Sequence, residues 1–384
     1  MNVAEFRRQM PVCRRWAYFD HAAVAPLPQP TREIIQRWAD EACQEGDTRW
    51  PQWSAAVEDT RRRAAALIGA SPDEIAFVAN TTSAITIVAE TFPWREGDNV
   101  VLPAQEFPSN VYPWMNLAGR GVEVRRVPID RQRSWTEQLA GACDERTRLL
   151  AISWVGYADG WRVDLDELVS FAEARHVRVL LDAIQGLGVF PIDVSHYPID
   201  YLAADGHKWL LGPEGAGILF IRCERLAELR PIGVGWHSVV HAHDYSRIEW
   251  NLRFDAARYE GGSANTVGLL ALGASLELLT SFGLSSRQSP LAGHVLEVTD
   301  ELARRIRHAG GQPLGPWPER HRSGILAFEL PGVPEKMARR MFLDQGVVLS
   351  CRNGRLRLSP HAYCDQEDVQ RFVEALDHVV RQRS

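Results

Sequence analysis

The chain has 384 residues, of which 45% are hydrophobic and 24% charged, and its formal net charge is −6. This length allows two domains with separate cores, and the acidic balance gives no reason to expect a nucleic-acid partner. The first residues lack the apolar stretch of a signal peptide and no apolar run is long enough to span a bilayer, so we expect a cytoplasmic protein without a membrane partner.

The first two thirds of the chain predict an α/β domain. We expect residues 1–30 to be irregular and helices to follow at 31–45 and 57–68. From residue 75, apolar strands alternate with helices. The expected strands are 75–79, 99–103, 122–127, 148–155, 178–182, 201–204 and 215–221, and the helices are 80–92, 109–118, 134–143 and 164–176. This alternation predicts a mostly parallel sheet flanked by helices.

The last third has a different pattern. A helix over 265–279 precedes a further helix at 292–308, and the rest alternates between strands at 325–329 and 356–359 and helices at 334–343 and 366–381. We therefore expect a large domain over 16–264 and a smaller α+β C-terminal domain over 265–384, which also includes residues 1–15.

Lysine is rare in this chain, since Lys208 and Lys336 are the only two. Arginine stays protonated, whereas a lysine can lose its proton and attack a carbonyl group. Lys336 lies at an ordinary exposed helix start. Lys208 lies between an apolar run and the sequence Trp-Leu-Leu-Gly-Pro, where burial would lower the pKa of its amine. We interpret Lys208 as a Schiff-base lysine; the alternative is a surface lysine whose stem crosses apolar surface.

Polar and aromatic side chains follow several predicted strands, at the edge of the sheet where ligands of open α/β folds bind. They are Asn80, Thr81, Thr82 and Ser83 at a helix start, then Phe107, Tyr157, Asp182, Gln185, Asp205, His207 and Lys208. The helix start suits a phosphate, although the same side chains also suit plain helix capping. Alone, Asp182 could be a turn residue and Phe107 could fill the core.

Together these side chains match pyridoxal 5′-phosphate (PLP). That cofactor needs a lysine for its aldehyde, a carboxylate that keeps the pyridine nitrogen protonated, a stacking ring and a phosphate cradle.

Asp182-Ala183-Ile184-Gln185 followed by Asp205-Gly206-His207-Lys208 resembles the class V aminotransferase family of fold-type I PLP enzymes. The family includes cysteine desulfurases, selenocysteine lyases, isopenicillin N epimerases and kynureninases, and the resemblance runs from Tyr18 to the last helix. It implies a fold-type I PLP-dependent transferase fold in which Lys208 carries the cofactor, Asp182 pairs with the pyridine nitrogen and Gln185 faces the phenolic oxygen.

The resemblance also implies roles for residues that bind phosphate and substrate. Thr81, Thr82 and His207 would hold the phosphate. Ser263, in the segment 260–265, would reach the phosphate of the neighbouring subunit in a homodimer. Arg357, in the segment 356–361, would clamp the α-carboxylate of an amino-acid substrate through a planar bidentate contact.

Three positions depart from the desulfurase pattern. Phe107 stands where desulfurases stack a histidine on the cofactor, and phenylalanine stacks but cannot shuttle protons. Asp205 replaces a serine that commonly binds phosphate, so we expect its carboxylate to turn away or to accept a hydrogen bond from an amide. Tyr157 replaces an asparagine; it would touch the cofactor or substrate, or act as an acid or base, and the alternative is a packed tyrosine.

The sequence therefore predicts a PLP-dependent enzyme that acts on an α-amino acid, with a lyase that cleaves a C–S or C–Se bond favoured. An epimerase or an aminotransferase would use the same residues. A non-catalytic PLP-binding protein would have no need of Lys208, Asp182 and Arg357 together. A nucleotide-dependent enzyme is disfavoured, because the expected glycine-rich motifs are missing.

Two further groups of residues carry predictions. His237, His241, His243 and Asp244 match no metal-ligand spacing, so we expect no metal and interpret them as a hydrated loop or part of the substrate mouth. The six cysteines show no paired spacing and are interpreted as reduced thiols. Desulfurases carry a cysteine loop just before the carboxylate-binding arginine, but here Asn353-Gly354 predicts a tight hairpin turn, so we expect no persulfide-forming cysteine.

Overall fold

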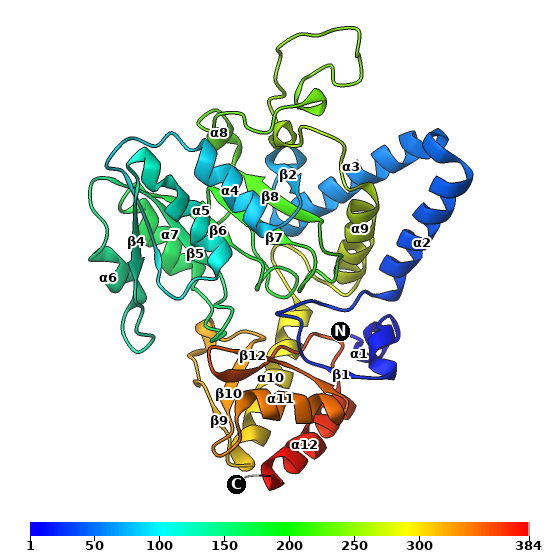
Figure 1. Cartoon of the computed structure of the whole chain (residues 1–384), viewed down its shortest axis with the longest axis vertical. Coiled ribbons are helices and arrows are strands. Elements are labelled where there is room, and N and C mark those ends of the chain that lie inside the picture. The colour runs from blue at the N-terminus through cyan, green and yellow to red at the C-terminus, as the bar shows by residue number, and fades with distance from the viewer. Residues whose placement is uncertain (383–384) are drawn as a thin grey trace.

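The computed structural model describes residues 1–382 and has a seven-stranded sheet at its centre, in the spatial order β2-β8-β7-β6-β5-β3-β4 (Figure 1). Its strands are β2 (Ile75–Val78), β3 (Asn99–Pro103), β4 (Glu123–Val127), β5 (Thr147–Ser153), β6 (Arg178–Asp182), β7 (Tyr201–Asp205) and β8 (Gly217–Ile221). Strand β8 runs antiparallel to both of its neighbours and the other adjacent pairs are parallel. The carboxyl ends of six strands therefore meet at one edge.

Both faces of this sheet are buried except at the edge strand β4, which explains the nearly continuous apolar runs of the other strands. Alternate residues of each strand point to opposite faces: Leu180 and Tyr201 pack on the side of α4, and Leu181 and Leu202 pack on the other. The helices of this part are α2 (Gln29–Gln44), α3 (Trp50–Ile68), α4 (Thr81–Thr91), α5 (Tyr112–Met115), α6 (Trp135–Ala140), α7 (Leu165–Glu173), α8 (Cys223–Leu226) and α9 (Thr266–Ser281).

The predicted helix at 109–118 is broken in the structure into α5 and two short 3₁₀ segments. Pro108 and Pro113 lack the backbone N–H that a continuous helix needs, which accounts for the interruption.

A second, four-stranded antiparallel sheet lies below the first in Figure 1, in the order β12-β13-β10-β9. It comprises β9 (Gln312–Pro313), β10 (Leu326–Glu329), β12 (Ser350–Arg352) and β13 (Arg355–Leu358), and it packs with α10 (Pro290–His308), α11 (Glu335–Asp344) and α12 (Gln366–Arg381). Asn353 and Gly354 join β12 to β13 with φ angles of 51° and 74°, both left-handed. The predicted two-residue hairpin turn is confirmed.

The expectation of irregular structure over residues 1–30 is wrong. This segment contains α1 (Val3–Arg8) and β1 (Ala17–Tyr18), and β1 pairs in parallel with β11 (Val347–Val348). Helix α1 is a little under two turns long and buries Phe6, which stacks on Phe282 at a ring distance of 4.5 Å. Neither element had a local signal, because so short a helix shows no periodic pattern and β1 exists through a partner more than 300 residues away.

The chain crosses between its two parts twice. Residues 1–20 lie with the smaller part: β1 pairs with β11 in a separate two-stranded sheet, and Asp20 forms an ion pair with Arg357 of the small sheet. Helix α9 packs against α2 and α3 of the larger part, and α10 begins the smaller one. The domain division at residue 264 stays a prediction, and this packing favours a boundary between α9 and α10.

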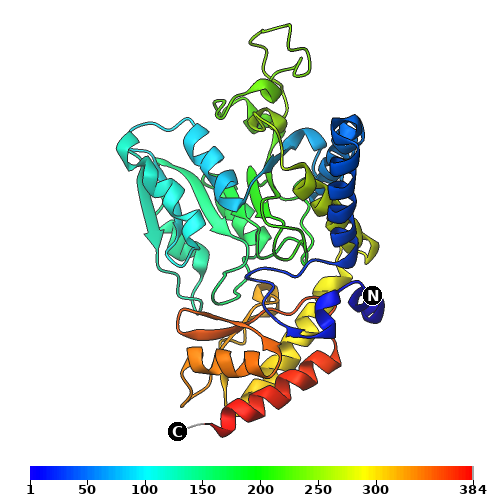
Figure 2. The same cartoon turned by 45° about the vertical axis from the view of Figure 1, so that its right-hand side comes forward.

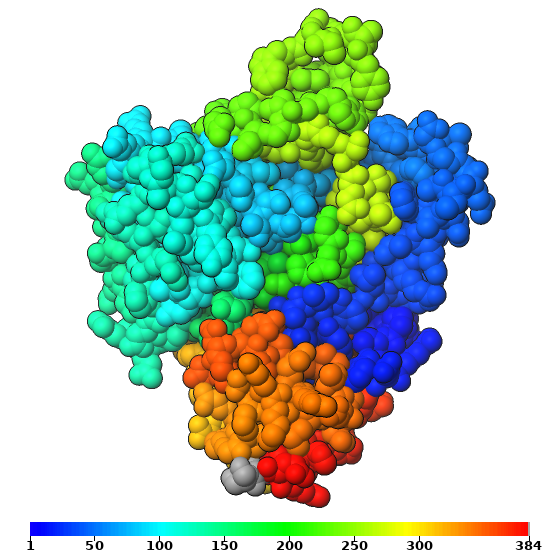
Figure 3. All heavy atoms as spheres, in the orientation of Figure 1, coloured from blue at the N-terminus to red at the C-terminus, as the bar shows by residue number. Residues whose placement is uncertain are grey.

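Residues 233–255 include an arm that projects from the body in both ribbon views and in the space-filling view (Figures 1, 2 and 3), whereas Ala256, Ala257 and Tyr259 are buried at its base. Large apolar side chains are exposed along it, including Tyr245, Ile248, Trp250 and Phe254. Within residues 1–382, no helix is both long and apolar enough to cross a membrane.

Candidate active site

A cavity of about 300 Å³ opens at the edge where the parallel strands end, between the large sheet and the β12–β13 hairpin. Nine of the ten predicted site residues line it, namely Thr81, Thr82, Phe107, Tyr157, Asp182, Gln185, His207, Lys208 and Arg357. The tenth, Ser263, lies in a different hollow beside the arm. The cavity is where the rule that ligands bind at the carboxyl ends of parallel strands predicts it.

Lys208 follows β7 and is 9% exposed, so it is not a surface lysine. Burial lowers the pKa of its amine to about 8, and the nearby carboxylate of Asp182 opposes that fall. Its Nζ lies 5.6 Å from the centre of the Phe107 ring. A substantial neutral fraction of this amine is therefore present near physiological pH.

Asp182 ends β6 and is 3% exposed. Its Oδ1 accepts one hydrogen bond, from the Ile184 amide at 3.1 Å, and no ion pair engages it within residues 1–382. Burial raises the pKa of this carboxyl to about 6, and Lys208 opposes the rise. A buried carboxylate with spare acceptor capacity suits a cationic N–H, as the protonated pyridine of PLP would present.

Gln185 is held in one orientation by its neighbours. The indole N–H of Trp209 donates to Oε1 at 2.8 Å, which fixes that atom as the amide oxygen because an indole can only donate. Nε2 donates one hydrogen to the Ala22 carbonyl at 3.0 Å. Its second hydrogen is left for a ligand, as the predicted contact with a phenolic oxygen requires.

Several polar groups gather where α4 begins, at the predicted phosphate site. Asn80 caps this helix by accepting from the Ser83 amide. The Thr81 hydroxyl is buried without a hydrogen-bond partner among residues 1–382, and the Thr82 hydroxyl reaches Ser109 at 2.8 Å. An unsatisfied buried hydroxyl at a helix N-terminus is the kind of group that a phosphate would complete.

The Asp205 carboxylate takes one of the two orientations expected for it, with a hydrogen bond from an amide. Its Oδ1 accepts from the Gly206 amide at 2.7 Å, as predicted, and its Oδ2 lies 2.8 Å from His207 Nδ1. The carboxylate is therefore engaged by its own neighbours, the Gly206 amide and the His207 ring. His207 can present its other ring nitrogen to the cavity that it lines.

Two aromatic rings stand over the cavity. Phe107 and Tyr157 pack edge to face at 5.1 Å, and Phe107 is 40% exposed, so a ligand ring stacked on it would cover apolar surface. The Tyr157 hydroxyl lies 3.5 Å from Asn353 Oδ1 at the hairpin turn. Tyr157 is thus part of the cavity wall and not a tyrosine packed within the core.

Arg357 reaches the cavity from β13 and is 1% exposed. Its guanidinium donates to Ser350 Oγ at 3.1 Å, to the Tyr157 carbonyl at 2.7 Å and to Asp20 Oδ1 at 3.2 Å. Burial lowers its pKa to about 10, and Asp20 opposes this. Three of five N–H groups are used, which leaves one on each terminal nitrogen for a carboxylate.

Sequence reasoning missed four residues at this site. Asp20 and Ser350 orient Arg357, and Arg352 lines the cavity beside it. Glu106 is buried behind the cavity, where it accepts from the Ser153 amide at 2.8 Å and from Asn110 at 3.0 Å; burial raises its pKa to about 7. The hairpin register was the available signal for Ser350 and Arg352, because cross-strand partners share a face.

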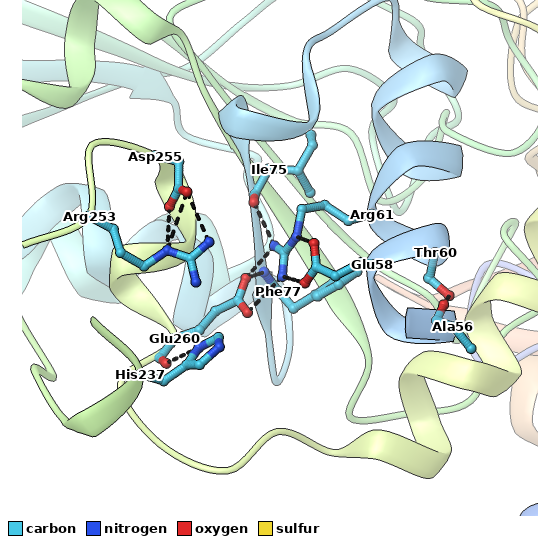
Figure 4. A network of polar contacts seen from close by, with 10 residues as sticks. All are labelled: Ala56, Glu58, Thr60, Arg61, Ile75, Phe77, His237, Arg253, Asp255 and Glu260. Carbon is cyan, nitrogen blue, oxygen red and sulfur yellow. Dashed lines mark hydrogen bonds and ion pairs between the residues drawn. The ribbon is translucent and has the colours of Figure 1, made fainter. Parts of the chain in front are cut away.

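Ser263 follows a segment that is anchored to the large sheet (Figure 4). The Glu260 carboxylate accepts from the Phe77 amide at 2.7 Å and pairs with Arg61, whose nitrogens lie 2.5 and 3.0 Å away. All five N–H groups of Arg61 are used, the others by Glu58 and the Ile75 carbonyl. This buried network fixes the base of the arm immediately before Ser263.

The histidines of the arm stand apart from the cavity. His237 Nδ1 lies 3.2 Å from the Glu260 carbonyl and its ring is near Trp236 and His243. Among residues 1–382, no group of three or more His, Cys, Asp or Glu side chains is arranged to hold a metal ion. These residues do not line the cavity of Lys208 and so do not form its mouth within this chain.

Comparison with known proteins gives matches over nearly the whole chain. The family model described as aminotransferase class-V matches residues 17–372. A probable cysteine desulfurase of Methanothermobacter thermautotrophicus is 30% identical over an alignment of 403 positions, which covers 99% of this chain and 98% of the relative.

Two solved structures have the same fold. A mutant of C-DES with glycine covalently linked to its PLP cofactor has a TM-score of 0.91 at 22% identity and covers 97% of this chain and 99% of its own. The complex of the cystine C–S lyase C-DES with its product, cysteine persulfide, has a TM-score of 0.89 at 23% identity and covers 97% and 100%. The predicted α/β architecture is confirmed.

Proposed function

Because this chain belongs to the class-V aminotransferase family, we propose that it is a PLP-dependent lyase that cleaves the C–S bond of cysteine or of a cysteine derivative. The family assignment confirms the predicted cofactor and the predicted enzyme class, and it supports an amino acid as substrate. The observation that carries the proposal is that a buried lysine and a buried carboxylate, Lys208 and Asp182, line the same cavity.

The residues present fit the cofactor. Thr81, Thr82 and His207 would bind its phosphate, Asp182 its pyridine nitrogen, and Gln185 its phenolic oxygen, while Phe107 would cover one face of the ring. When bound, PLP supplies an aldehyde for the substrate amine and an electron-withdrawing ring that stabilises negative charge at Cα.

The proton transfers are assigned to Lys208. Its Nζ would take the Cα proton of the substrate, and its lowered pKa keeps part of the population neutral for that task. Asp182 holds a proton at the pyridine nitrogen. Arg357 orients the substrate by its α-carboxylate, with Asp20 and Ser350 fixing the guanidinium.

The overall reaction then balances without a protein thiol. β-Elimination from cysteine with addition of water gives pyruvate, ammonia and sulfide, and no oxidant or reductant is consumed. Formation of alanine would instead need an acceptor for the sulfur atom, which a persulfide-forming cysteine supplies in the usual desulfurases.

The reaction is tested by incubating the holoenzyme with L-cysteine, L-cystine and S-alkyl cysteines. We expect pyruvate and a sulfur product in equal amounts. Racemised substrate without cleavage would indicate an epimerase, amino transfer to a keto acid would indicate an aminotransferase, and no turnover of any amino acid would indicate a non-catalytic PLP-binding protein.

We expect PLP capture by the apoenzyme to speed up as the pH rises through about 8. Only the neutral amine of Lys208 attacks an aldehyde, and burial sets its pKa at about 8. Below that pH the rate should fall by about tenfold per unit, and above it the rate should level off. Stopped-flow absorbance of apoenzyme mixed with PLP measures this rate. A rate still rising near the ordinary lysine pKa of about 10.4 would contradict the burial argument.

We expect Cys351→Ser and Cys364→Ala to keep turnover within about twofold of the parent enzyme, since neither thiol is suited to attack. Cys351 alternates with the cavity-facing residues of β12, and its sulfur contacts the Glu335 carbonyl at 3.4 Å. Cys364 is fully buried, and burial raises the pKa of both thiols. Turnover per mole of bound PLP measures the effect. Loss of most activity in either variant, with PLP still bound, would place the enzyme among persulfide-forming desulfurases.

We also propose a homodimer in which Ser263 reaches the phosphate of the neighbouring cavity. The absence of Ser263 from the cavity of its own subunit, the anchored segment before it and the exposed apolar arm support this arrangement. Mixed dimers of Ser263→Ala and Lys208→Ala subunits test it. If the serine acts across subunits, one cavity of the mixed dimer has both defects and the other has neither, and the mixture should regain activity. If the serine acts within its own subunit, each cavity has one defect and activity should not return. A cytoplasmic location stays a prediction.

A further inference from the structure

The face of the small sheet that looks into the cavity carries three arginines. In the antiparallel register, Ser350 pairs with Arg357 and Arg352 pairs with Arg355, and paired residues point to the same side. Ser350 Oγ accepts from Arg357, which shows that this side faces the cavity. Arg352, Arg355 and Arg357 are therefore on one face.

These three cations differ in their partners. Arg357 pairs with Asp20 at 3.2 Å and Arg355 with Glu329 at 2.8 Å. Arg352 makes no ion pair anywhere in the described chain, from Met1 to Gln382, and the one hydrogen bond that its side chain donates runs from NH1 to the Cys351 carbonyl at 2.7 Å. It is half-buried and lines the cavity. A partly desolvated cation without an anion faces the space that a substrate would fill.

The hairpin register sets the spacing between Arg352 and Arg357. The two are diagonal neighbours across the hairpin, and such residues lie about 7–8 Å apart. The tight Asn353-Gly354 turn keeps Arg352 on a strand, so its backbone is held in place. The charge of Arg352 also acts on Lys208: after burial and the charge of Arg357, it contributes to the lowered pKa of the Lys208 amine.

We propose that Arg352 binds a second carboxylate at the far end of the substrate, so that the preferred substrate is a cysteine derivative whose sulfur substituent ends in a carboxylate. This inference rests on the proposed C–S lyase function, with Arg357 at the α-carboxylate. The distal carboxylate fits a guanidinium because the planar donor group can bind both oxygens. Plain cysteine leaves Arg352 without a partner and is the poorer substrate.

The test compares two substrates that differ only in charge. S-(2-Carboxyethyl)-L-cysteine and its carboxamide, S-(2-carbamoylethyl)-L-cysteine, both release a thiol and pyruvate on elimination. The holoenzyme should prefer the carboxylate in kcat/KM by at least about tenfold, the range of a charge-assisted hydrogen bond at a partly exposed site. Arg352→Gln should reduce this preference to about onefold. Arg355→Gln, a matched change on the same face outside the cavity, should keep the preference of the parent enzyme.

A binding measurement is independent of turnover. Calorimetry should show that the holoenzyme binds glutarate more tightly than its monoamide, and that Arg352→Gln removes this difference while Arg355→Gln does not. If Arg352→Gln keeps both the substrate preference and the glutarate preference, the inference is overturned. If no cysteine derivative releases a thiol, the lyase proposal fails, and the glutarate comparison still decides the role of Arg352.

Discussion

Lys208→Ala is expected to lower turnover by about 10⁴-fold, the largest effect of any single substitution here, because the residue both holds the cofactor and moves the Cα proton. The structure places its amine in a cavity with Asp182 and beside the Phe107 ring, where burial lowers the amine pKa. Borohydride should fix PLP to the parent enzyme and leave the variant unlabelled. Pyruvate formation and the mass of the reduced protein measure the two effects.

The chain offers a matched control for this experiment. Lys336 is the other lysine, and it is exposed on α11. Lys336→Ala should keep both the turnover and the borohydride-fixed label. A label that persists in Lys208→Ala and disappears in Lys336→Ala would show that the cofactor lysine has been assigned to the wrong residue.

Arg357→Lys is expected to lower kcat/KM by about 30- to 1000-fold, which corresponds to about 2–4 kcal/mol of substrate binding in the transition state. Lysine keeps a positive charge near Asp20 but cannot offer two parallel N–H groups to a carboxylate. Alanine is a poorer test, because it would leave the buried Asp20 without its ion-pair partner and so destabilise the fold.

PLP affinity separates this role from a structural one. Arg357 contacts Ser350, Tyr157 and Asp20, and none of the predicted phosphate ligands, so the variant should bind PLP as the parent does. Arg355→Lys, a change of the same type outside the cavity, should have no comparable effect on kcat/KM. An unchanged kcat/KM in Arg357→Lys would remove this arginine from substrate binding.

The sequence was most informative about site residues that lie at or just after the end of a predicted strand. Asp182, His207 and Lys208 could be placed together because each is next to a predicted parallel strand, and those strands end at one edge. The Asn353-Gly354 turn was predictable for a similar reason, since its two residues specify their own backbone conformation.

Contacts between distant segments were not predictable from one sequence. The ion pair of Asp20 with Arg357 joins residues 337 positions apart, and it depends on β1 pairing with β11. The orientation of Gln185 depends on Trp209, and the Glu260–Arg61 pair depends on the packing of α3 beside β2. None of these pairs produces a local pattern, because their geometry exists only after the two segments that carry the partners have packed together.

The double crossing of the chain has a mechanical consequence. A body attached to another by two separate covalent links can rock about the line through them, but it cannot swivel freely. The first link, which follows Asp20, also lines the cavity. Its Ala22 carbonyl accepts from Gln185 Nε2, and its Ala25 amide donates to the His207 carbonyl at 2.7 Å. Any rocking that carries Arg357 toward a substrate must therefore pull on the same backbone segment that steadies Gln185 and His207. A movement of Arg357 and the position of Gln185 and His207 would thus be coupled through this segment.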